Sequence, residues 1–182
     1  MYSILKIKAA TIVGLSLGCL ALFSCTPEST TLSSHSYFDL NGFLDSEISR
    51  LKDKHNVIEK TININGLLET RVVKNADFEK ELALFREGDI NKNAWKDGFS
   101  NDSNDKFIQY LRIDDKIPVK LLRIEKNQQG IVGITIIIER KNLLYLTSDT
   151  LIYIPSKGYE IKKYQKLKIA SPKTYSITGK YR

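Results

Sequence analysis

The first segment with apolar residues at helical spacing lies between Asp39 and Lys54. Asp39 is a suitable helix cap, because its carboxylate can accept hydrogen bonds from the first unpaired backbone amides. Gly42 lowers the helix propensity of the first turn, so we expect the helix to begin nearer Phe43. The residues that recur every three or four positions, and should face the core, are Leu44, Ile48 and Leu51.

A second helical pattern runs from Asn75 to Glu87. We expect Asn75 to cap this helix and Gly88 to end it, since asparagine is favoured at helix starts and glycine just after helix ends. The residues that line its apolar face are Phe78, Leu82 and Phe85. Both predicted helices lie in the N-terminal half of the chain.

Asn65-Gly66, between these helices, predicts a β-hairpin with one of two registers. A two-residue loop would place an apolar residue opposite a charge and two cations opposite each other: Ile62 with Glu69, and Lys60 with Arg71. A three-residue loop would instead pair Ile62 with Leu68 and leave Gly66 at the position that needs a positive φ. We therefore predict the three-residue loop.

The remainder of the chain alternates between apolar and polar residues and predicts strands, after a polar, loop-like stretch over residues 89–105. The connections are too short for parallel crossovers, so the strands should be antiparallel neighbours. The predicted fold class is α+β, a curved antiparallel sheet of about eight strands packed by the two N-terminal helices. The six C-terminal strands are Lys106–Asp114, Val119–Lys126, Ile131–Arg140, Leu143–Ile154, Tyr159–Ile169 and Lys173–Tyr181.

Two of these strands differ in how they should be covered. Ile131–Ile138 is apolar at almost every position, which predicts a central strand covered on both faces. Tyr159–Ile169 alternates, with apolar residues on one face and a wet, basic face on the other. That basic face is a candidate surface for a membrane or a partner, and its cations are Lys162, Lys166 and Lys168. The alternative is that these lysines only keep the strand soluble.

The N-terminus has the pattern of an export signal, with Lys6 and Lys8 before an uncharged run that ends at Cys25. The run Ala9–Phe23 is shorter than the roughly 20 residues that span a bilayer. An uncleaved anchor remains an alternative, and Cys19 is a rival for the modified cysteine. Cys25 is preferred because the chain changes from apolar to polar at this position.

Leu22-Phe23-Ser24-Cys25 resembles the lipobox of bacterial lipoproteins. The resemblance implies that the thiol of Cys25 is lipidated with acyl chains such as palmitate and that the preceding residues are removed. It divides the chain into a signal peptide over residues 1–24, a lipidated cysteine and flexible tether over 25–36, and one α+β domain over 37–182. Because Thr26 is not aspartate, the resemblance also implies the outer membrane of the cell envelope.

Charge is distributed unevenly in a chain of net charge +7. Residues 116–182 contain 14 basic and 4 acidic residues, whereas residues 26–115 are acidic overall. In an exported protein, anionic lipid head groups are a more suitable partner for such a basic segment than nucleic acid, which we do not expect as a partner.

After the predicted cleavage site, the sequence contains no Gly-x-Ser-x-Gly, no phosphate-binding glycine-rich loop, no His-Glu-x-x-His motif and no pair of cysteines. We therefore expect neither an enzyme nor a cofactor. His35 falls in the tether and His55 at a helix end, where solvent-facing positions are expected. Asp97, Asp102 and Asp105 do not follow the spacing of a calcium-binding loop, so we predict a solvated turn and no metal site. Trp95 is expected to close one end of the core.

Three further segments resemble envelope lipoproteins of the Bacteroidota: Tyr37-Phe38-Asp39-Leu40, Asp89-Ile90-Asn91-Lys92 with Trp95, and Tyr175-x-Ile177-x-Gly179-Lys180. The resemblance implies an envelope context, with a possible envelope protein partner, and supplies no catalytic residues. The expected architecture is also similar to lipid-carrier half-barrels of the LolA/LolB kind, a likeness of architecture alone. We therefore expect a membrane-anchored, non-enzymatic binding or structural module. The alternative is a carrier or sensor of an apolar ligand, with a cavity lined by residues such as Ile134, Ile136 and Phe85.

Overall fold

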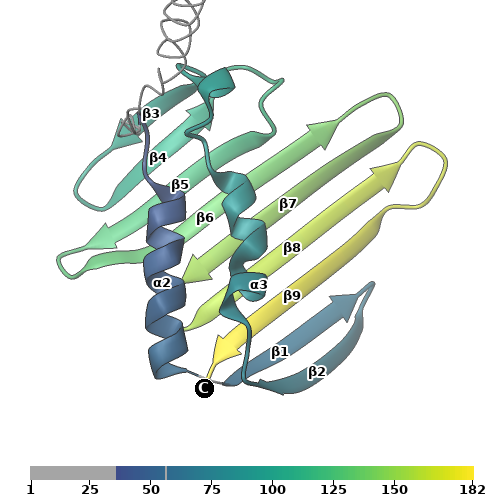
Figure 1. Ribbon diagram of the computed structural model, residues 1–182. Coiled ribbons are helices and arrows are strands. Elements are labelled where there is room, and N and C mark those ends of the chain that lie inside the picture. The colour runs from purple at the N-terminus through teal and green to yellow at the C-terminus, as the bar shows by residue number, and fades with distance from the viewer. Residues whose placement is uncertain (1–35, 56) are drawn as a thin grey trace, which may run out of the picture. The chain divides into compact units, whose positions relative to one another are not determined.

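The computed structural model describes residues 36–55 and 57–182, which form an α+β domain (Figure 1). The expected α+β class is confirmed, with nine antiparallel strands in one open sheet and the helices in the N-terminal half. The helical segments are α2 (Leu40–Lys54), α3 (Phe78–Leu82) and two 3-10 helices, Ala83–Gly88 and Asn93–Trp95. The strands are β1 (Val57–Ile64), β2 (Leu67–Lys74), β3 (Phe99–Ser103), β4 (Phe107–Arg112), β5 (Val119–Asn127), β6 (Gly130–Lys141), β7 (Tyr145–Ile154), β8 (Gly158–Leu167) and β9 (Lys173–Tyr181).

After α2 the chain forms the β1–β2 hairpin, then crosses the sheet once, and then continues from β3 to β9 as consecutive antiparallel strands. The strand order is β2-β1-β9-β8-β7-β6-β5-β4-β3. The β1–β2 hairpin forms one edge, and α3 with its 3-10 continuation passes over the sheet to the other edge, where β3 begins (Figure 1). From β3 to β9 each strand pairs with the next, and β9 then pairs with β1. Strand β9 therefore joins the β1–β2 hairpin to the run of strands from β3 to β8.

The helices pack on one face of the sheet, and the buried core lies between these two layers (Figure 1). All six apolar residues predicted for the helical faces are buried: Leu44, Ile48, Leu51, Phe78, Leu82 and Phe85. Helix α2 has the expected cap, since Asp39 accepts a hydrogen bond from the Gly42 amide. This bond stabilises the first turn and offsets the low helix propensity of glycine. The helix therefore begins at Leu40, and the predicted start near Phe43 is wrong.

The predicted boundaries of the second helix also need correction. Its cap is Asp77, whose carboxylate accepts a hydrogen bond from the Lys80 amide, and not Asn75. Asn75 has a φ of 52°, a left-handed conformation outside a helix. After Leu82 the chain tightens into the 3-10 helix that ends at Gly88, so the α-helical part is short.

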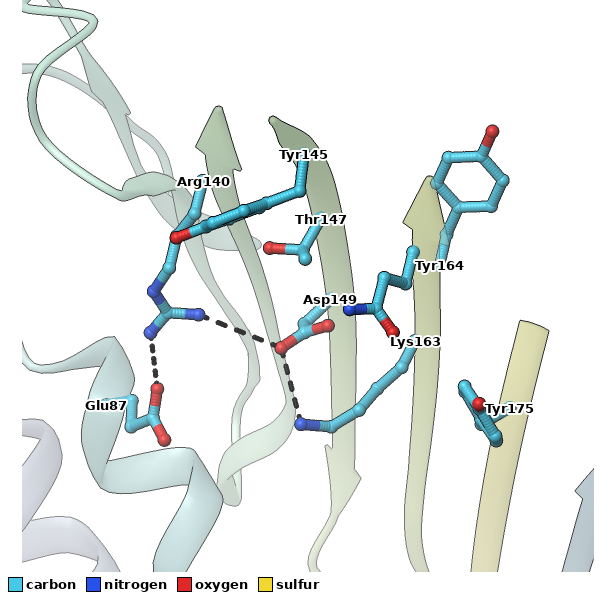
Figure 2. Close-up of a pocket in the computed structure, with 9 residues that line it drawn as sticks. Glu87, Arg140, Tyr145, Thr147, Asp149, Lys163, Tyr164 and Tyr175 are labelled. Atoms are coloured by element: carbon cyan, nitrogen blue, oxygen red, sulfur yellow. Dashed lines mark hydrogen bonds and ion pairs between the residues drawn. The ribbon is translucent and has the colours of Figure 1, made fainter. Parts of the chain in front are cut away.

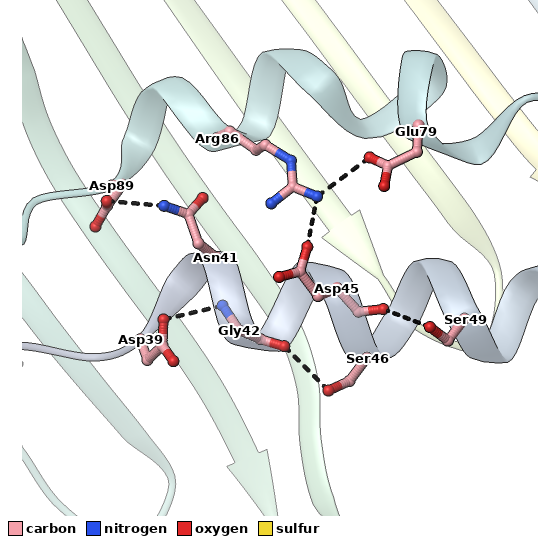
Figure 3. A network of polar contacts seen from close by, with 9 residues as sticks. All are labelled: Asp39, Asn41, Gly42, Asp45, Ser46, Ser49, Glu79, Arg86 and Asp89. Atoms are coloured by element: carbon pink, nitrogen blue, oxygen red, sulfur yellow. Dashed lines mark hydrogen bonds and ion pairs between the residues drawn. The ribbon is translucent and has the colours of Figure 1, made fainter. Parts of the chain in front are cut away.

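Polar contacts join the two helices across their exposed sides (Figure 3). Arg86 donates hydrogen bonds to Asp45 at 2.6 Å and to Glu79 at 3.2 Å, which links α2 to the segment that crosses the sheet. Asn41 donates to Asp89 at 2.8 Å near the other end of the same interface. These contacts fix the position at which the crossing segment leaves the sheet face.

Two glutamates attach the helices to the sheet beneath them. Glu47 on α2 is 9% exposed and accepts a hydrogen bond of 2.6 Å from the hydroxyl of Tyr153 on β7. Glu81 on α3 accepts hydrogen bonds from the hydroxyl of Tyr159 on β8 and from Lys60 on β1. A buried carboxylate is tolerated only with such partners, so both contacts fix the helices to particular strands.

The β1–β2 hairpin has the two-residue loop, and the predicted three-residue loop is wrong. Ile62 pairs with Glu69 and Lys60 with Arg71. The residues of the loop, Asn65 and Gly66, both have positive φ, as the favoured two-residue hairpin turn requires. Tertiary contacts remove the objection to this register: Ile62 is opposite Ile177 on the β9 side, and Lys60 is neutralised by Glu81.

Three expectations for the sheet also fail in part. The stretch predicted as loop contains β3, a polar edge strand that pairs with β4. Strand β6 has one buried face, with Ile134, Ile136 and Ile138 at 0–1% exposure, but none of the described helices lies on its other face (Figure 1). Ile169 was expected on the buried face of β8 and is instead 97% exposed, because β8 ends at Leu167.

Candidate functional site

The helices cover only part of the sheet face, and a recess of about 500 Å³ lies beside the end of the crossing segment (Figure 2). One wall is Glu87, in the 3-10 helix that follows α3. The other lining residues come from β6 to β9, where these strands extend beyond the helices (Figure 1). They are Arg140, Tyr145, Thr147, Asp149, Lys163, Tyr164, Gln165 and Tyr175.

Asp149 on β7 forms the floor of the recess and is 6% exposed. Its Oδ2 atom lies 3.4 Å from the Lys163 ammonium and 3.9 Å from the Arg140 guanidinium (Figure 2). Both separations are longer than a good hydrogen bond. No described residue donates a hydrogen bond to the Asp149 carboxylate, and neither of its oxygens is among the fully buried side-chain atoms without a partner. The carboxylate therefore reaches the space of the recess and can accept a hydrogen bond there.

The alternation of β7 explains why this carboxylate faces the recess. Asp149, Leu151 and Tyr153 share one face of the strand, and the last two are buried in the core under the helices. Asp149 precedes Leu151 by two residues on this face and lies where the helices end. It is opposite Ile138 on β6 and Lys163 on β8. The sheet register therefore brings the cation of β8 next to the carboxylate.

The charges around the recess are balanced. Arg140 donates a hydrogen bond of 2.6 Å to Glu87, so the two cations Arg140 and Lys163 face two carboxylates. Thr147 and Gln165 add neutral polar groups, and Tyr145 and Tyr175 add aromatic rings with hydroxyl groups. Such a lining offers hydrogen-bond donors and acceptors beside flat apolar surfaces, without an excess of either charge.

The three lysines predicted as a basic face lie along β8 and in the turn that follows it. Lys162 projects from the face of β8 away from the helices, where it pairs with Glu160 at 3.2 Å and lines a second recess of about 350 Å³. Lys166 and Lys168 lie at the far end of β8, beside the β6–β7 turn. All three are exposed.

The first described residues are attached to a particular place on the domain. The Tyr37 amide donates to Asn91 Oδ1, and Asn91 Nδ2 donates to the Phe38 carbonyl, each at 3.0 Å. The Tyr37 ring packs edge-on against Phe99 and Tyr110 at 5.5 and 5.3 Å. Two of the segments that carry the resemblance to envelope lipoproteins are thus neighbours in the fold. Cys25 and the other residues of the predicted signal and tether up to residue 35 lie outside the described residues.

Several smaller expectations can be compared with the structure. Trp95 packs against the core as expected and is half-buried, with the Lys92 ammonium 4.1 Å from its ring centre. His55 is partly exposed at the end of α2, and its ring stacks on Tyr181 at 5.4 Å. Asp102, expected in a turn, lies in β3. Within residues 36–55 and 57–182, no cluster of three or more histidine, cysteine, aspartate or glutamate residues could hold a metal ion.

The sequence reasoning missed the recess, although β7 contained a signal. Asp149 is the single charge in β7, on the face that also contains the buried Leu151 and Tyr153, and a nearly buried aspartate is unusual. Its partners Arg140 and Lys163 belong to other strands and become neighbours only through the sheet register.

No helix among the described residues is long and apolar enough to cross a membrane. Comparisons with family models, with curated proteins and with solved structures gave no match.

Proposed function

We propose that this chain is a membrane-anchored lipoprotein of the bacterial cell envelope, at the outer membrane by resemblance, whose folded domain is a non-enzymatic binding module. The apolar run that ends at Cys25 supports the anchor. The contacts of Tyr37 and Phe38 with Asn91 also support it, because they begin the packed domain where the polar tether was predicted to end. The tether would keep the domain close to the membrane surface.

The recess around Asp149 is the proposed binding site, and its carboxylate, which accepts no hydrogen bond from the described residues, is the observation on which this depends. A ligand hydroxyl would donate a hydrogen bond to this carboxylate in place of water. The balanced charges favour a neutral ligand, and the rings of Tyr145 and Tyr175 suit the C–H face of a sugar. We therefore expect a hydroxyl-rich, uncharged ligand such as an oligosaccharide.

The packing of the core supports this module over a carrier of an apolar ligand. Ile134, Ile136 and Phe85, which would line a carrier cavity, are 0–1% exposed. The Phe85 ring makes edge-on contacts with Tyr153 at 5.9 Å and Tyr159 at 6.2 Å. Side chains therefore occupy the space between helix and sheet at this point.

Calorimetric titration of the full chain in detergent with neutral tetrasaccharides (cellotetraose, maltotetraose and chitotetraose) tests the site. We expect heat of binding with at least one of them, and its loss in Asp149→Asn, because the amide replaces one acceptor by a donor. Glu160→Gln is the matched control, since Glu160 is a strand carboxylate on the face away from the helices. Equal binding by both variants, or no binding to any sugar, would contradict the proposal.

Metabolic labelling with radioactive palmitate tests the anchor. The wild-type chain and Cys19→Ser should incorporate label when expressed in a bacterium, and Cys25→Ser should not. Label that persists in Cys25→Ser would show that the attachment site has been misplaced.

A further inference from the structure

The large apolar side chains that are exposed on the described residues gather at one end of the strands. This end contains the β1–β2, β4–β5, β6–β7 and β8–β9 connections. Of eleven such residues, only Val72 and Val132 lie within strands away from these connections. The other nine are Ile64, Leu67, Leu68, Leu111, Ile113, Leu143, Leu144, Tyr145 and Ile169.

The connections at the opposite end of the strands show that the turns themselves do not require apolar residues. They consist of Asn104–Lys106 between β3 and β4, Gln128-Gln129 between β5 and β6, and Pro155–Lys157 between β7 and β8. None of these residues is a large apolar one, which is usual for solvent-exposed turns. The asymmetry between the two ends therefore calls for a function at the apolar end.

Two of the apolar turns are held next to each other. The Lys168 amide donates to the Leu144 carbonyl at 2.9 Å, which joins the β8–β9 turn to the β6–β7 turn. Within the β6–β7 turn, Asn142 Oδ1 accepts hydrogen bonds from the amides of Leu144 and Tyr145. These polar contacts fix the backbone and leave Leu143 90% exposed. We call this pair of turns the basic apolar tip: Lys141, Leu143, Leu144, Lys166, Lys168 and Ile169.

The charged residues of the tip are all lysines, and they lie beside its aliphatic residues. Residues 140–148 and 161–173 contain no aspartate or glutamate. Aliphatic side chains flanked by lysines are suited to a bilayer surface, because the apolar groups enter the acyl boundary while the ammonium groups contact anionic head groups. The β4–β5 connection contains Asp114 and Asp115, so the match to an anionic surface is confined to the tip.

The entry point of the chain lies at the same end of the strands. Tyr37 packs against Phe99, and Phe99 pairs with Arg112, the last residue of β4 before the β4–β5 connection. The first described residues therefore contact the domain at the end that also contains the basic apolar tip. A tether that enters from a membrane would bring this end toward the lipid.

We propose that the basic apolar tip inserts into the surface of an anionic lipid bilayer. The tip forms a second contact with the membrane, separate from the Cys25 anchor and from the ligand recess. It sets the orientation of the domain, with the ends of β6 to β9 toward the lipid.

Fluorescence quenching by acyl-brominated lipids tests the insertion in the full chain. We would use the Trp95→Phe background with Leu144→Trp as reporter, and Gln128→Trp at the opposite end as matched control. Each chain is reconstituted in vesicles of brominated phosphatidylcholine with phosphatidylglycerol. All the chains have the same N-terminal segment, so a difference in quenching reports on the position of the tryptophan. We expect loss of fluorescence at position 144 and none at 128, and a smaller loss with Lys141→Gln, Lys166→Gln and Lys168→Gln combined.

Equal quenching at positions 144 and 128, or no quenching at 144, would overturn the proposal. Hydrogen exchange of the unsubstituted chain provides the same test if a variant fails to fold. Amides of residues 141–145 and 167–170 should gain protection on reconstitution in anionic vesicles, whereas unchanged exchange there would contradict insertion. Neither experiment depends on a sugar ligand, so the proposal can fail while the recess proposal holds.

Discussion

The buried tyrosines predict that the domain loses stability steeply at alkaline pH. Burial raises the pKa of Tyr153 and Tyr159 well above the ordinary value near 10, and hydrogen bonds to Glu47 and Glu81 act in the same direction. Burial also raises the pKa of Tyr181, to about 12. In the unfolded chain these hydroxyls regain their ordinary pKa. Above pH 10 the folded chain therefore keeps protons that the unfolded chain releases.

The sign and the size of the effect follow from this difference in bound protons. A raised pKa contributes stability that is complete below pH 10 and is lost as the pH rises through the folded-state value. Each tyrosine that ionises only in the unfolded chain lowers the free energy of unfolding by about 1.4 kcal/mol per pH unit. Tyr153, Tyr159 and Tyr181 together give about 4 kcal/mol per pH unit between pH 10 and about 12. A domain with the usual stability of about 5–15 kcal/mol should lose a large part of it in this interval.

Urea denaturation at a series of pH values from 8 to 12, followed by circular dichroism, measures this slope. The midpoint should be constant up to pH 9 and then fall. Tyr181→Phe is the sharpest control, because it removes one titrating group and also a buried hydroxyl without a hydrogen-bond partner among the described residues. Its slope should be smaller by about 1.4 kcal/mol per pH unit below pH 12. A midpoint that stays constant to pH 12 would refute the buried positions of these hydroxyls.

Three substitutions test the packing by the free energy of unfolding in urea. Glu47→Ala should cost about 1–3 kcal/mol, because it leaves the Tyr153 hydroxyl buried without its acceptor, and a near-zero cost would contradict this. Phe85→Ala should cost about 3–5 kcal/mol by opening a cavity in the core, and a near-neutral effect would show that the site collapses. Gly158→Ala should cost more than Gly130→Ala, since both have positive φ but only at Gly158 does a new Cβ clash with a backbone oxygen, that of Gly179; equal costs would contradict this difference.

Local patterns predicted the elements that local contacts determine. The Asp39 cap depends on an amide three residues away, and the apolar face of α2 is a matter of spacing, so both could be read from the sequence. Asn75 was wrongly expected to cap the second helix because Asp77, two residues later, competes for the same role and can also act at the helix start.

Features that depend on distant partners could not be predicted in this way. The pairing of Lys60 with Arg71 is unfavourable in an isolated hairpin and is tolerated because Glu81 lies above Lys60. Strand β3 was missed because only Phe99 of its residues is buried, and an edge strand can be polar on both faces. The recess was missed for a similar reason, since Asp149 and Lys163 become neighbours through pairing of β7 with β8.

The basic face was predicted from the alternation of β8, and the structure gives its lysines different surroundings. Alternation assigns a residue to a face of the sheet and contains no information about where the strand ends. Because β8 ends at Leu167, Lys168 belongs to a turn and lies with Leu144, whereas Lys162 stays in the middle of the sheet.

Backbone amide chemical shifts of the isotopically labelled full chain in detergent micelles, recorded during titration with a neutral tetrasaccharide, test the binding proposal most directly. The account predicts that the largest changes fall on residues that surround the recess: Arg140, Tyr145, Thr147, Asp149, Lys163 and Tyr175. Changes centred on Lys162 and Ser176, on the face away from the helices, would contradict the account, as would a spectrum that the sugars leave unchanged.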